Sequence, residues 1–476
     1  MTPVGLGDRG IRYLTVAAIA LAVALPGVPR QVAGVDPAIA GGAIVRVAAG
    51  QSENVAAFAR RAGATDVRSL GALDVVTAHL DATATRALAA HVSVKVIAAD
   101  AVIRASDLRM LDTPPLAGAG IVLGPLFSTY QTANSSVTVA VVDSGVADSA
   151  DLAGKVVARV NFVNDGAVAL DPGGHGTFIA GAIAGSVTGV DPNATLVSLR
   201  VLGESGSGSA RDALAAFDWL LRHRTDYRIA VVNLSWGATQ TTSYNRDVLE
   251  AAVESLWFAG MTVVAAAGNR GPLPGTVDTP AADPFVIAVG SAKSSDEMSE
   301  WSSRGPTLDG FIKPDVLARG EQIVSLRVPG SFLDRGTTDR DPALGAAYTT
   351  MSGTSVATAV ISGVAALLLQ RTVAFTPTVV KTAVVSTGQL FSGSSAPELV
   401  PSRAVAFSAN ATGSLANAGL HPSTLLLQVA APTLSGSNLT WENITWENIT
   451  WETITWETVT WETITWEARS GARVPR

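Results

Sequence analysis

Apolar runs alternate with helix-like patterns over the middle of the chain. Runs with the length of buried strands lie at 137–143, 196–202, 229–236, 261–269 and 284–291. Between several of them, as in 209–223 and 246–260, apolar residues recur with a helical period. Strands that are apolar on both faces and joined by helices form a parallel sheet covered on both sides. We therefore expect an α/β fold with a doubly wound, mostly parallel sheet over residues 136–400, and functional residues at the carboxyl ends of its strands.

A smaller unit with another pattern occupies residues 41–106. The sequence predicts, in order, a strand, a helix, a pair of strands, a helix and a final strand, at 43–48, 53–62, 67–70, 74–80, 83–90 and 94–103. This β-α-β-β-α-β order is that of a small α+β, ferredoxin-like unit. Proline, glycine and polar residues dominate the following stretch, which indicates a linker over 107–135.

The first 40 residues have the features of a signal peptide. Arg9 and Arg12 precede an apolar stretch, 14–25, that is short for a membrane span, and Ala38-Ile39-Ala40 offers a cleavage site. An uncleaved N-terminal anchor is the alternative. No later segment has the length and apolarity of a membrane helix, so we expect a secreted protein.

The C-terminal end repeats every five residues. After a connecting segment, 401–437, the region 438–476 carries tryptophan at 441, 446, 451, 456, 461 and 466. A period of five keeps tryptophan neither on one face of a strand nor on one stripe of a helix. The repeat faintly resembles pentapeptide β-helices, but an extended low-complexity tail is the favoured interpretation. Its Asn-x-Thr triplets at Asn438, Asn443 and Asn448 are glycosylation acceptors only if the host glycosylates exported proteins.

Composition narrows the candidate chemistry. The chain has no cysteine, which excludes disulfides, cysteine-bound zinc and thiol nucleophiles. Its net charge is -7 and no block of Lys or Arg stands out, so nucleic acid is not the expected partner. The acidic residues show no spacing typical of a metal loop, so we expect no cofactor and identify no clear metal site, with structural calcium as the open alternative.

A serine nucleophile needs a histidine base, and the chain has five histidines. His79 and His91 fall in the small N-terminal unit, whereas His223 and His421 have ordinary surface contexts. His175 is different, because glycines flank it in DPGGHGTFIAG and a helical pattern begins at once. We expect it at the exposed start of a helix that packs on the sheet.

Three further residues complete a candidate catalytic group. Asp143 ends the most apolar strand, where a buried carboxylate requires a partner. Asn269 follows another apolar strand, where its amide could donate to a developing oxyanion. Ser355 lies in SGTSVATA, before a long apolar run. Taken singly, each has a structural explanation as a turn or helix-cap residue.

Taken together, these segments resemble the subtilisin-like serine proteases (subtilases, the S8 peptidase family). The matching segments, spread over residues 136–390, are VAVVDSGV, GGHGTFIAG, NLSWG, AAAGN, SSRGP, IKPDV and SGTSVATA. The resemblance implies a secreted serine endopeptidase in which Ser355 is the nucleophile, His175 the general base and Asp143 its orienting partner. Asn269 would form the oxyanion hole with the Ser355 backbone N–H.

The resemblance also implies how polypeptide substrates bind and how the enzyme is made. The backbone of Ser235-Trp236-Gly237 and of Gly206-Ser207-Gly208 would pair with the extended substrate. Residues 41–106 would be a self-cleaved inhibitory propeptide that ends near Ser106. The enzyme would be made as a zymogen and would act as a monomer.

Several positions depart from the family pattern. Val356-Ala357-Thr358-Ala359 lacks the usual proline after the serine, and Arg319 replaces another common proline. A helix can begin without proline, so we expect activity to survive. The calcium-binding loop often found after the histidine helix is absent, which makes a tight calcium site of that kind doubtful.

Asp278 aligns with the base of the family's first specificity pocket. A carboxylate there would favour Arg or Lys at the cleaved position, and a solvated loop aspartate is the alternative.

Two further interpretations stay open. The chain could be a binding protein on a subtilase scaffold, with the tryptophan tail contacting a surface, glycan or protein. Alternatively, the N-terminal unit is never removed and the enzyme stays latent. The complete set of catalytic side chains argues against a purely non-catalytic scaffold.

Overall fold

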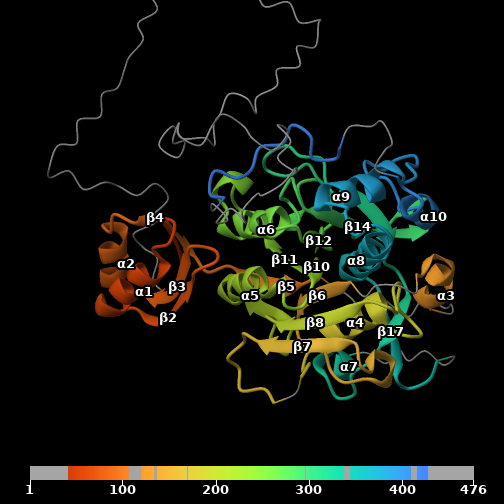
Figure 1. The fold of residues 1–476 in the computed structure, drawn as a ribbon, viewed down its shortest axis with the longest axis horizontal. Helices are drawn as coiled ribbons and strands as arrows, with labels where there is room; N and C mark the ends of the chain where they lie inside the picture. Colours follow the sequence, from red (N-terminus) through yellow and green to blue (C-terminus); the bar gives the residue numbers. More distant parts are fainter. Residues whose placement is uncertain are drawn as a thin grey trace, which may run out of the picture.

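The computed structural model describes residues 41–106, 120–132, 137–168, 170–294, 296–336, 344–408 and 415–426 (Figure 1). The signal peptide expected at 1–40, most of the linker and the repeat tail at 438–476 lie outside the described residues.

A large sheet of eight strands forms the centre of the main domain. The strand order is β15-β14-β12-β10-β6-β8-β7, and β16 pairs with β14. All of these pairings are parallel except that of β14 with β15. The sheet strands are β6 (Thr138–Asp143), β7 (Val156–Asn161), β8 (Thr195–Arg200), β10 (Ile229–Leu234), β12 (Thr262–Ala266), β14 (Ile287–Ser294), β15 (Glu297–Met298) and β16 (Val316–Arg319). Successive strands are added on both sides of β6, which places the topological switch point there.

Helices cover both faces of this sheet, so the predicted doubly wound α/β fold is confirmed (Figure 1). On one face, α4 (His175–Ala184) and α8 (Thr354–Arg371) pack against each other, and α8 runs along β10, β12 and β14. On the other face lie α5 (Ala210–His223) and α6 (Val248–Phe258). The shorter helices are α3 (Leu123–Phe127), α7 (Phe332–Gly336), α9 (Pro377–Ser386) and α10 (Pro401–Val405).

The expectation that no segment after the N-terminal stretch has the length and apolarity of a membrane helix is wrong for α8. Within the described part of the chain, α8 is the one helix with the length and hydropathy of a membrane span, and 94% of that stretch is buried inside the protein. It is surrounded by sheet and helices, and a core helix of this kind is apolar all round.

The N-terminal unit has the β-α-β-β-α-β order that the sequence predicts. Its sheet order is β2-β3-β1-β4, and all the pairings that the structure records in detail are antiparallel. Its elements are β1 (Gly41–Val47), α1 (Ser52–Arg61), β2 (Thr65–Leu70), β3 (Val75–Leu80), α2 (Ala82–Ala89) and β4 (Val94–Ala99). The helices and one sheet face enclose a separate apolar core that includes Val45, Val55 and Leu88.

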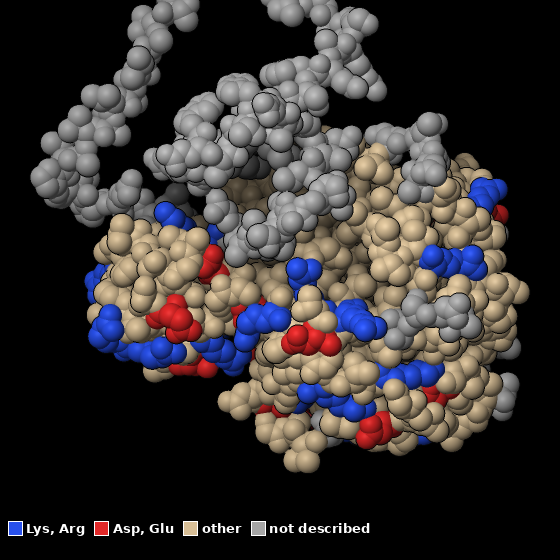
Figure 2. All heavy atoms as spheres, in the orientation of Figure 1, with Lys and Arg blue, Asp and Glu red and all other residues tan. Residues whose placement is uncertain are grey.

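The other side of the N-terminal sheet contacts the main domain near α5. Leu73 and Val75 belong to the main apolar core. Arg68 pairs with Asp212 at 2.8 Å, and the Ala72 N–H donates to Asp218 at 2.7 Å. In the space-filling view, basic and acidic side chains lie side by side along this boundary (Figure 2).

One sequence prediction in this unit is wrong. The expected final strand over 94–103 is two strands, because the chain leaves the N-terminal sheet after β4 and forms β5 (Val102–Ala105). β5 pairs with main-domain strands in a second sheet of order β13-β11-β5-β9. Its partners are β9 (Ser207–Ser209) and β11 (Trp236–Thr239), and β13 (Asp278–Thr279) completes the sheet. A last pair, β17 (Ile323–Leu326) with β18 (Tyr348–Met351), leads into α8.

A buried ion cluster ties α9 to the edge of the main sheet. Asp315 accepts from Lys313 at 2.7 Å and lies 3.1 Å from the Lys381 ammonium, and the side chains of both lysines are at most 4% exposed. Both ammonium groups also donate to the carbonyl of Val286. Burial opposes ionisation of Asp315, but the two lysines outweigh it and hold its pKa below the usual value. Removing the carboxylate would take from two buried lysines the acceptor that they share, with Asp283 as their remaining acidic neighbour.

We expect Asp315→Asn to lower the free energy of unfolding by about 3–5 kcal/mol, because a broken buried ion pair leaves an uncompensated charge. Urea unfolding followed by circular dichroism, in a Ser355→Ala background that prevents self-digestion, measures the change. Glu297→Gln is the matched control, because its pair with Lys293 is exposed at 3.6 Å; we expect a change below about 0.5 kcal/mol. Equal effects of the two variants would contradict a structural role for the buried cluster.

Candidate active site

The predicted catalytic residues meet at the carboxyl end of the sheet, beside the switch point. Asp143 is the last residue of β6, and His175 is the first residue of α4. Ser355 is the second residue of α8, and Asn269 follows β12 after a short turn. Parallel strands and right-handed crossovers bring these ends to one edge although the residues are far apart in the chain.

Asp143 and His175 form a hydrogen-bonded pair. The distance from His175 Nδ1 to Asp143 Oδ1 is 2.7 Å, and the same oxygen accepts from the Ser144 N–H at 2.7 Å. A carboxylate at Nδ1 keeps the proton there, so that Nε2 is the atom available as a base. Asp143 is fully buried, and these donors offset part of the cost of burying it.

The expected exposure of His175 is wrong for this structure. Its exposed fraction is 2%, and Ser355 is fully buried. Ala105 of β5 lines a small cavity together with His175, Phe332 and Leu333. The histidine is therefore at a helix start, as predicted, but other segments cover it.

Asp171 is a positioning residue that the sequence analysis missed. Its carboxylate accepts from the Gly174 N–H at 2.8 Å, the Thr177 N–H at 2.8 Å and the Ser144 hydroxyl at 2.8 Å. Burial raises its pKa, and these donors oppose the rise. Asp171 thereby connects the first turn of α4 to the segment after β6, and so fixes the position at which α4 begins with His175. An aspartate four residues before the histidine was the available signal, since carboxylates are favoured at helix N-termini.

Ser355 lies at the N-terminus of the long buried helix α8. Its Oγ donates to the Ser235 carbonyl at 2.8 Å, and the Ser235 hydroxyl donates to the Ser355 carbonyl at 3.0 Å. The N-terminal N–H groups of a helix are free to donate and carry partial positive charge. A tetrahedral oxyanion formed at Ser355 would therefore lie in a favourable field.

Asn269 is oriented by a residue that the sequence did not single out. Thr354 donates to Asn269 Oδ1 through its N–H at 3.1 Å and through its hydroxyl at 2.9 Å. Two donors on the oxygen assign the amide orientation and leave the Asn269 NH₂ group as the donor toward the site. Asn269 is 8% exposed, so this donor acts where water is scarce.

The two segments predicted to pair with substrate lie on either side of β5. On the β11 side, Trp236 is opposite Ala105 and Gly237 is opposite Arg104. On the β9 side, Ser207 is opposite Arg104. Beyond the strand, the Ser106 N–H donates to the Ser235 carbonyl at 3.3 Å, and the Ala105 N–H donates to the Gly206 carbonyl at 2.8 Å. The chain thus holds its own residues 102–106 where an extended peptide would lie.

Side chains and close backbone contacts beneath these strands hold them in position. The Trp236 indole N–H donates to the Val142 carbonyl at 2.8 Å, and its ring stacks on Phe217 with centroids 6.3 Å apart. A Cβ on Gly208 would approach the Val201 carbonyl oxygen to 2.2 Å. Glycine is needed at this position because the backbone passes so close.

Asp278 lies directly behind β11 at Gly237, and its carboxylate already has a partner. A Cβ at Gly237 would approach its Cβ to 2.6 Å, and Arg270 donates to its Oδ1 at 2.5 Å. Burial raises the pKa of Asp278 to about 6, and Arg270 opposes the rise. Sequence reasoning found the carboxylate and missed the neighbouring arginine, which is eight residues earlier in the chain.

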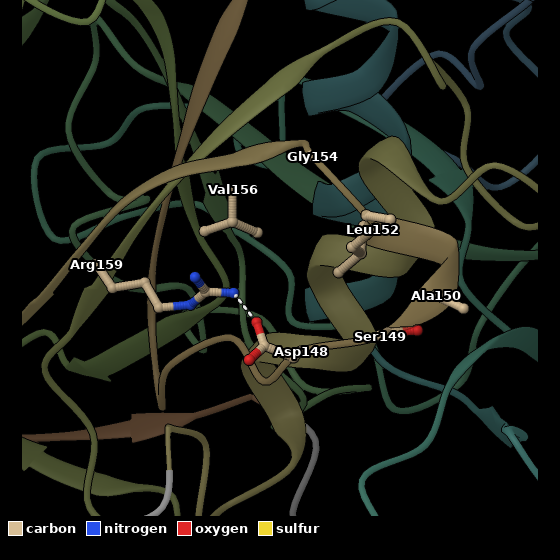
Figure 3. A pocket seen from close by; sticks show the side chains of 8 residues that line it. Asp148, Ser149, Ala150, Leu152, Gly154, Val156 and Arg159 are labelled. Atoms are coloured by element: carbon tan, nitrogen blue, oxygen red, sulfur yellow. Dashed lines mark hydrogen bonds and ion pairs between the residues drawn. The ribbon is translucent and has the colours of Figure 1, made fainter.

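Other hollows and clusters do not add to this site. Among the described residues, no group of three or more His, Asp and Glu is placed to hold a metal ion. A surface hollow of about 420 Å³ lies between the segment after β6 and β7 (Figure 3). Its Arg159 is already paired with Asp148 at 2.6 Å, and its lining includes none of the four candidate catalytic residues.

Comparison with known proteins extends the argument from geometry. The model of the Peptidase_S8 (subtilase) family matches residues 134–414. Serine protease AprX of Bacillus subtilis is 38% identical over 264 residues, which are 52% of this chain and 59% of that protein. Extracellular serine proteinase of a Thermus species is 34% identical over 256 residues, 54% of this chain and 56% of that protein. The chain thus spans less than two thirds of the length of either relative.

A solved structure also matches part of this chain. The crystal structure of a cold adapted subtilisin-like serine proteinase shares 32% identity, with a TM-score of 0.46, over 56% of this chain and 88% of that one. The family match covers more than half of this chain, including Asp143, His175, Asn269 and Ser355. This chain therefore belongs to the subtilase family.

Proposed function

We propose that the protein is a serine endopeptidase with Asp143, His175 and Ser355 as its catalytic triad. The observation that carries the proposal is the 2.7 Å Asp143–His175 hydrogen bond at the same sheet edge as Ser355. Asn269 and the strands β9 and β11, between which β5 lies in an extended form, support the proposal further.

In the first half-reaction, His175 Nε2 takes the proton of Ser355 Oγ as the oxygen attacks the substrate carbonyl carbon. The carbonyl π bond becomes an oxyanion, which the Asn269 NH₂ and the Ser355 N–H stabilise. When the tetrahedral intermediate collapses, the C–N bond breaks and imidazolium His175 gives its proton to the leaving amine. An acyl ester on Ser355 remains.

In the second half-reaction, water replaces the amine. His175 removes a proton from water, the hydroxide oxygen attacks the ester carbon, and the same donors receive the second oxyanion. The ester C–O bond breaks, Ser355 Oγ recovers a proton from His175, and the new carboxylate product leaves. His175 carries every proton transfer, so the mechanism requires no cofactor. We also propose that the enzyme is a monomer, because all of the groups named in this mechanism come from one chain.

We further propose that residues 41–106 are an inhibitory propeptide. The pairing of β5 with β9 and β11 supports a cut directly after Ser106, because the Ser106 N–H donates to the Ser235 carbonyl, which also accepts from Ser355 Oγ. After the cut, the segment before Ser106 would remain bound as a product. The polar contacts between β2 and α5 would slow its release.

We propose export as the setting of this activity. The N-terminal apolar stretch with its Ala-x-Ala site supports it. A Thermus relative is named an extracellular proteinase, which also favours this setting.

Self-processing is the first test. We expect residues 41–476 to release a fragment that ends at Ser106, whereas Ser355→Ala stays intact, because the attacking oxygen is lost. Intact-mass spectrometry of both purified proteins locates the cut. Equal processing of the two proteins would assign the cut to another protease. Absence of both processing and casein hydrolysis in the wild type would contradict the proposed activity and favour a binding protein on this scaffold.

Asp278 as selector of a basic side chain at the cleaved position remains a proposal, now with Arg270 as a competitor for the carboxylate. We expect Arg270→Gln to raise the kcat/KM ratio of Lys over Leu peptides by about 10-fold at pH 8, because a charge-assisted pair replaces the internal one.

The pKa of Asp278 determines in which direction the preference for Lys peptides changes with pH. The pKa of Asp278 is about 6, so its negative charge is lost as pH falls through that value. Removing Arg270 takes away a cation that lowers this pKa, so the variant's preference should decline already above pH 6. Arg270→Gln/Asp278→Asn is the control and should lose the gain. An unchanged Lys-to-Leu ratio in Arg270→Gln would show that Asp278 does not face the bound side chain.

A further inference from the structure

We propose that α7 is a specificity wall, with Phe332 and Leu333 selecting a small side chain two residues before the bond that is cut. The inference rests on the proposed proteolytic function and assigns the side-chain class that the same site accepts at this position, called P2 below. In the bound segment the P2 residue is Ala105, because Ser106 precedes the proposed cleavage point.

Side chains of β5 alternate between buried and exposed, which shows which of them the main domain contacts. Ile103 is fully buried and Ala105 is 6% exposed, whereas Val102 is 52% exposed and Arg104 also faces solvent. Side chains in a strand point alternately to opposite faces. The enzyme therefore surrounds the side chains at Ala105 and Ile103, and leaves that of Arg104 to water.

The space around Ala105 is nearly filled. The cavity beside it is lined by His175, Gly173, Gly206, Phe332 and Leu333, together with Glu204 and Ser205. Its remaining volume is about 10 Å³, roughly the lower limit for one water molecule. Leucine in place of alanine adds three carbon atoms, which this space cannot take without movement of the wall.

The wall is fixed to the catalytic loop, so it cannot easily move aside. The Phe332 N–H donates to the Pro172 carbonyl at 2.9 Å, and the Leu333 N–H donates to the Gly173 carbonyl at 3.1 Å. These carbonyls belong to the loop that ends at His175. A Cβ on Gly174 would approach Ser331 Oγ to 2.3 Å, so α7 and this loop are in direct contact.

A second attachment holds α7 to the substrate side. Arg335 of α7 forms an ion pair with Glu204, which lies just before β9, and Arg327 forms an ion pair with Asp334. Phe332 also lines a wide hollow of about 650 Å³ on its other side, with Gly203, Ser205 and Arg335. The wall therefore separates the filled cavity from open space, and shortening a wall residue would make room for a larger side chain.

The test compares peptide substrates with the processed enzyme. Internally quenched peptides carry Ile-Arg-Ala-Ser, Ile-Arg-Leu-Ser or Ile-Arg-Phe-Ser before the scissile bond. We expect the wild type to cleave the Ala peptide with a kcat/KM at least about 10-fold above that of the Leu peptide, the usual scale for added methylenes in a tight pocket. Leu333→Ala should bring the two within about 3-fold of each other.

Leu390→Ala is the matched control, because Leu390 is 61% exposed and is absent from the lining of this cavity. It should keep the wild-type ratio. Phe332→Ala and Leu333→Val are measured beside Leu333→Ala, so that the test survives if one variant fails to fold. Equal cleavage of all three peptides by the wild type would overturn the proposal, as would wall variants that hydrolyse casein but keep the wild-type ratio.

A test within the chain uses the propeptide itself. We expect Ala105→Leu to slow self-processing at least about 10-fold, and Leu333→Ala in the same chain to restore it. Rescue by Leu333→Ala distinguishes a steric clash in the cavity from general damage to the propeptide, and absence of rescue counts against the wall. If the wild type cleaves no peptide at all, including the Ala peptide, the proposed function fails rather than the assignment of P2.

Discussion

The buried carboxylate of Asp143 constrains the rest of the site. A charge at the end of a fully buried strand is costly unless donors surround it, and here the Ser144 N–H and the His175 ring supply them. His175 can reach Asp143 only if α4 begins at the right place, and Asp171 sets that place through its hydrogen bonds to the first turn. A requirement of folding, satisfying one carboxylate, thus produces the orientation that a general base needs.

The second organising feature is the backbone of β9 and β11, whose facing edges would be unpaired without β5 between them. Strand edges with free N–H and C=O groups bind any extended segment that fits between them. In this structure β5 fills that gap, and it forms one sheet with both neighbours. Because its partners are mainly backbone atoms, strand pairing alone gives affinity with little selectivity.

Selectivity would then come from the few side chains that reach the bound strand. Phe332 and Leu333 lie beside Ala105, and the Asp278–Arg270 pair lies behind Gly237. The first contact is apolar and acts by volume, whereas the second is ionic and acts by charge. Because their physical origins differ, the two contacts would contribute to specificity independently.

The sequence by itself determined the α/β class, the compact N-terminal unit and the four candidate catalytic residues, because apolar periodicity and local motifs carry that information within short windows. Asp143, His175, Asn269 and Ser355 could be named as candidates from their strand-end and helix-start contexts, and the resemblance to the subtilases joined them into one site. Only the tertiary structure decided what lies around them. The break between β4 and β5, the pairing of Arg270 with Asp278 and the placing of α7 beside His175 depend on contacts between distant segments. No local pattern encodes such contacts, since they are selected by packing and by the need to pair buried polar groups.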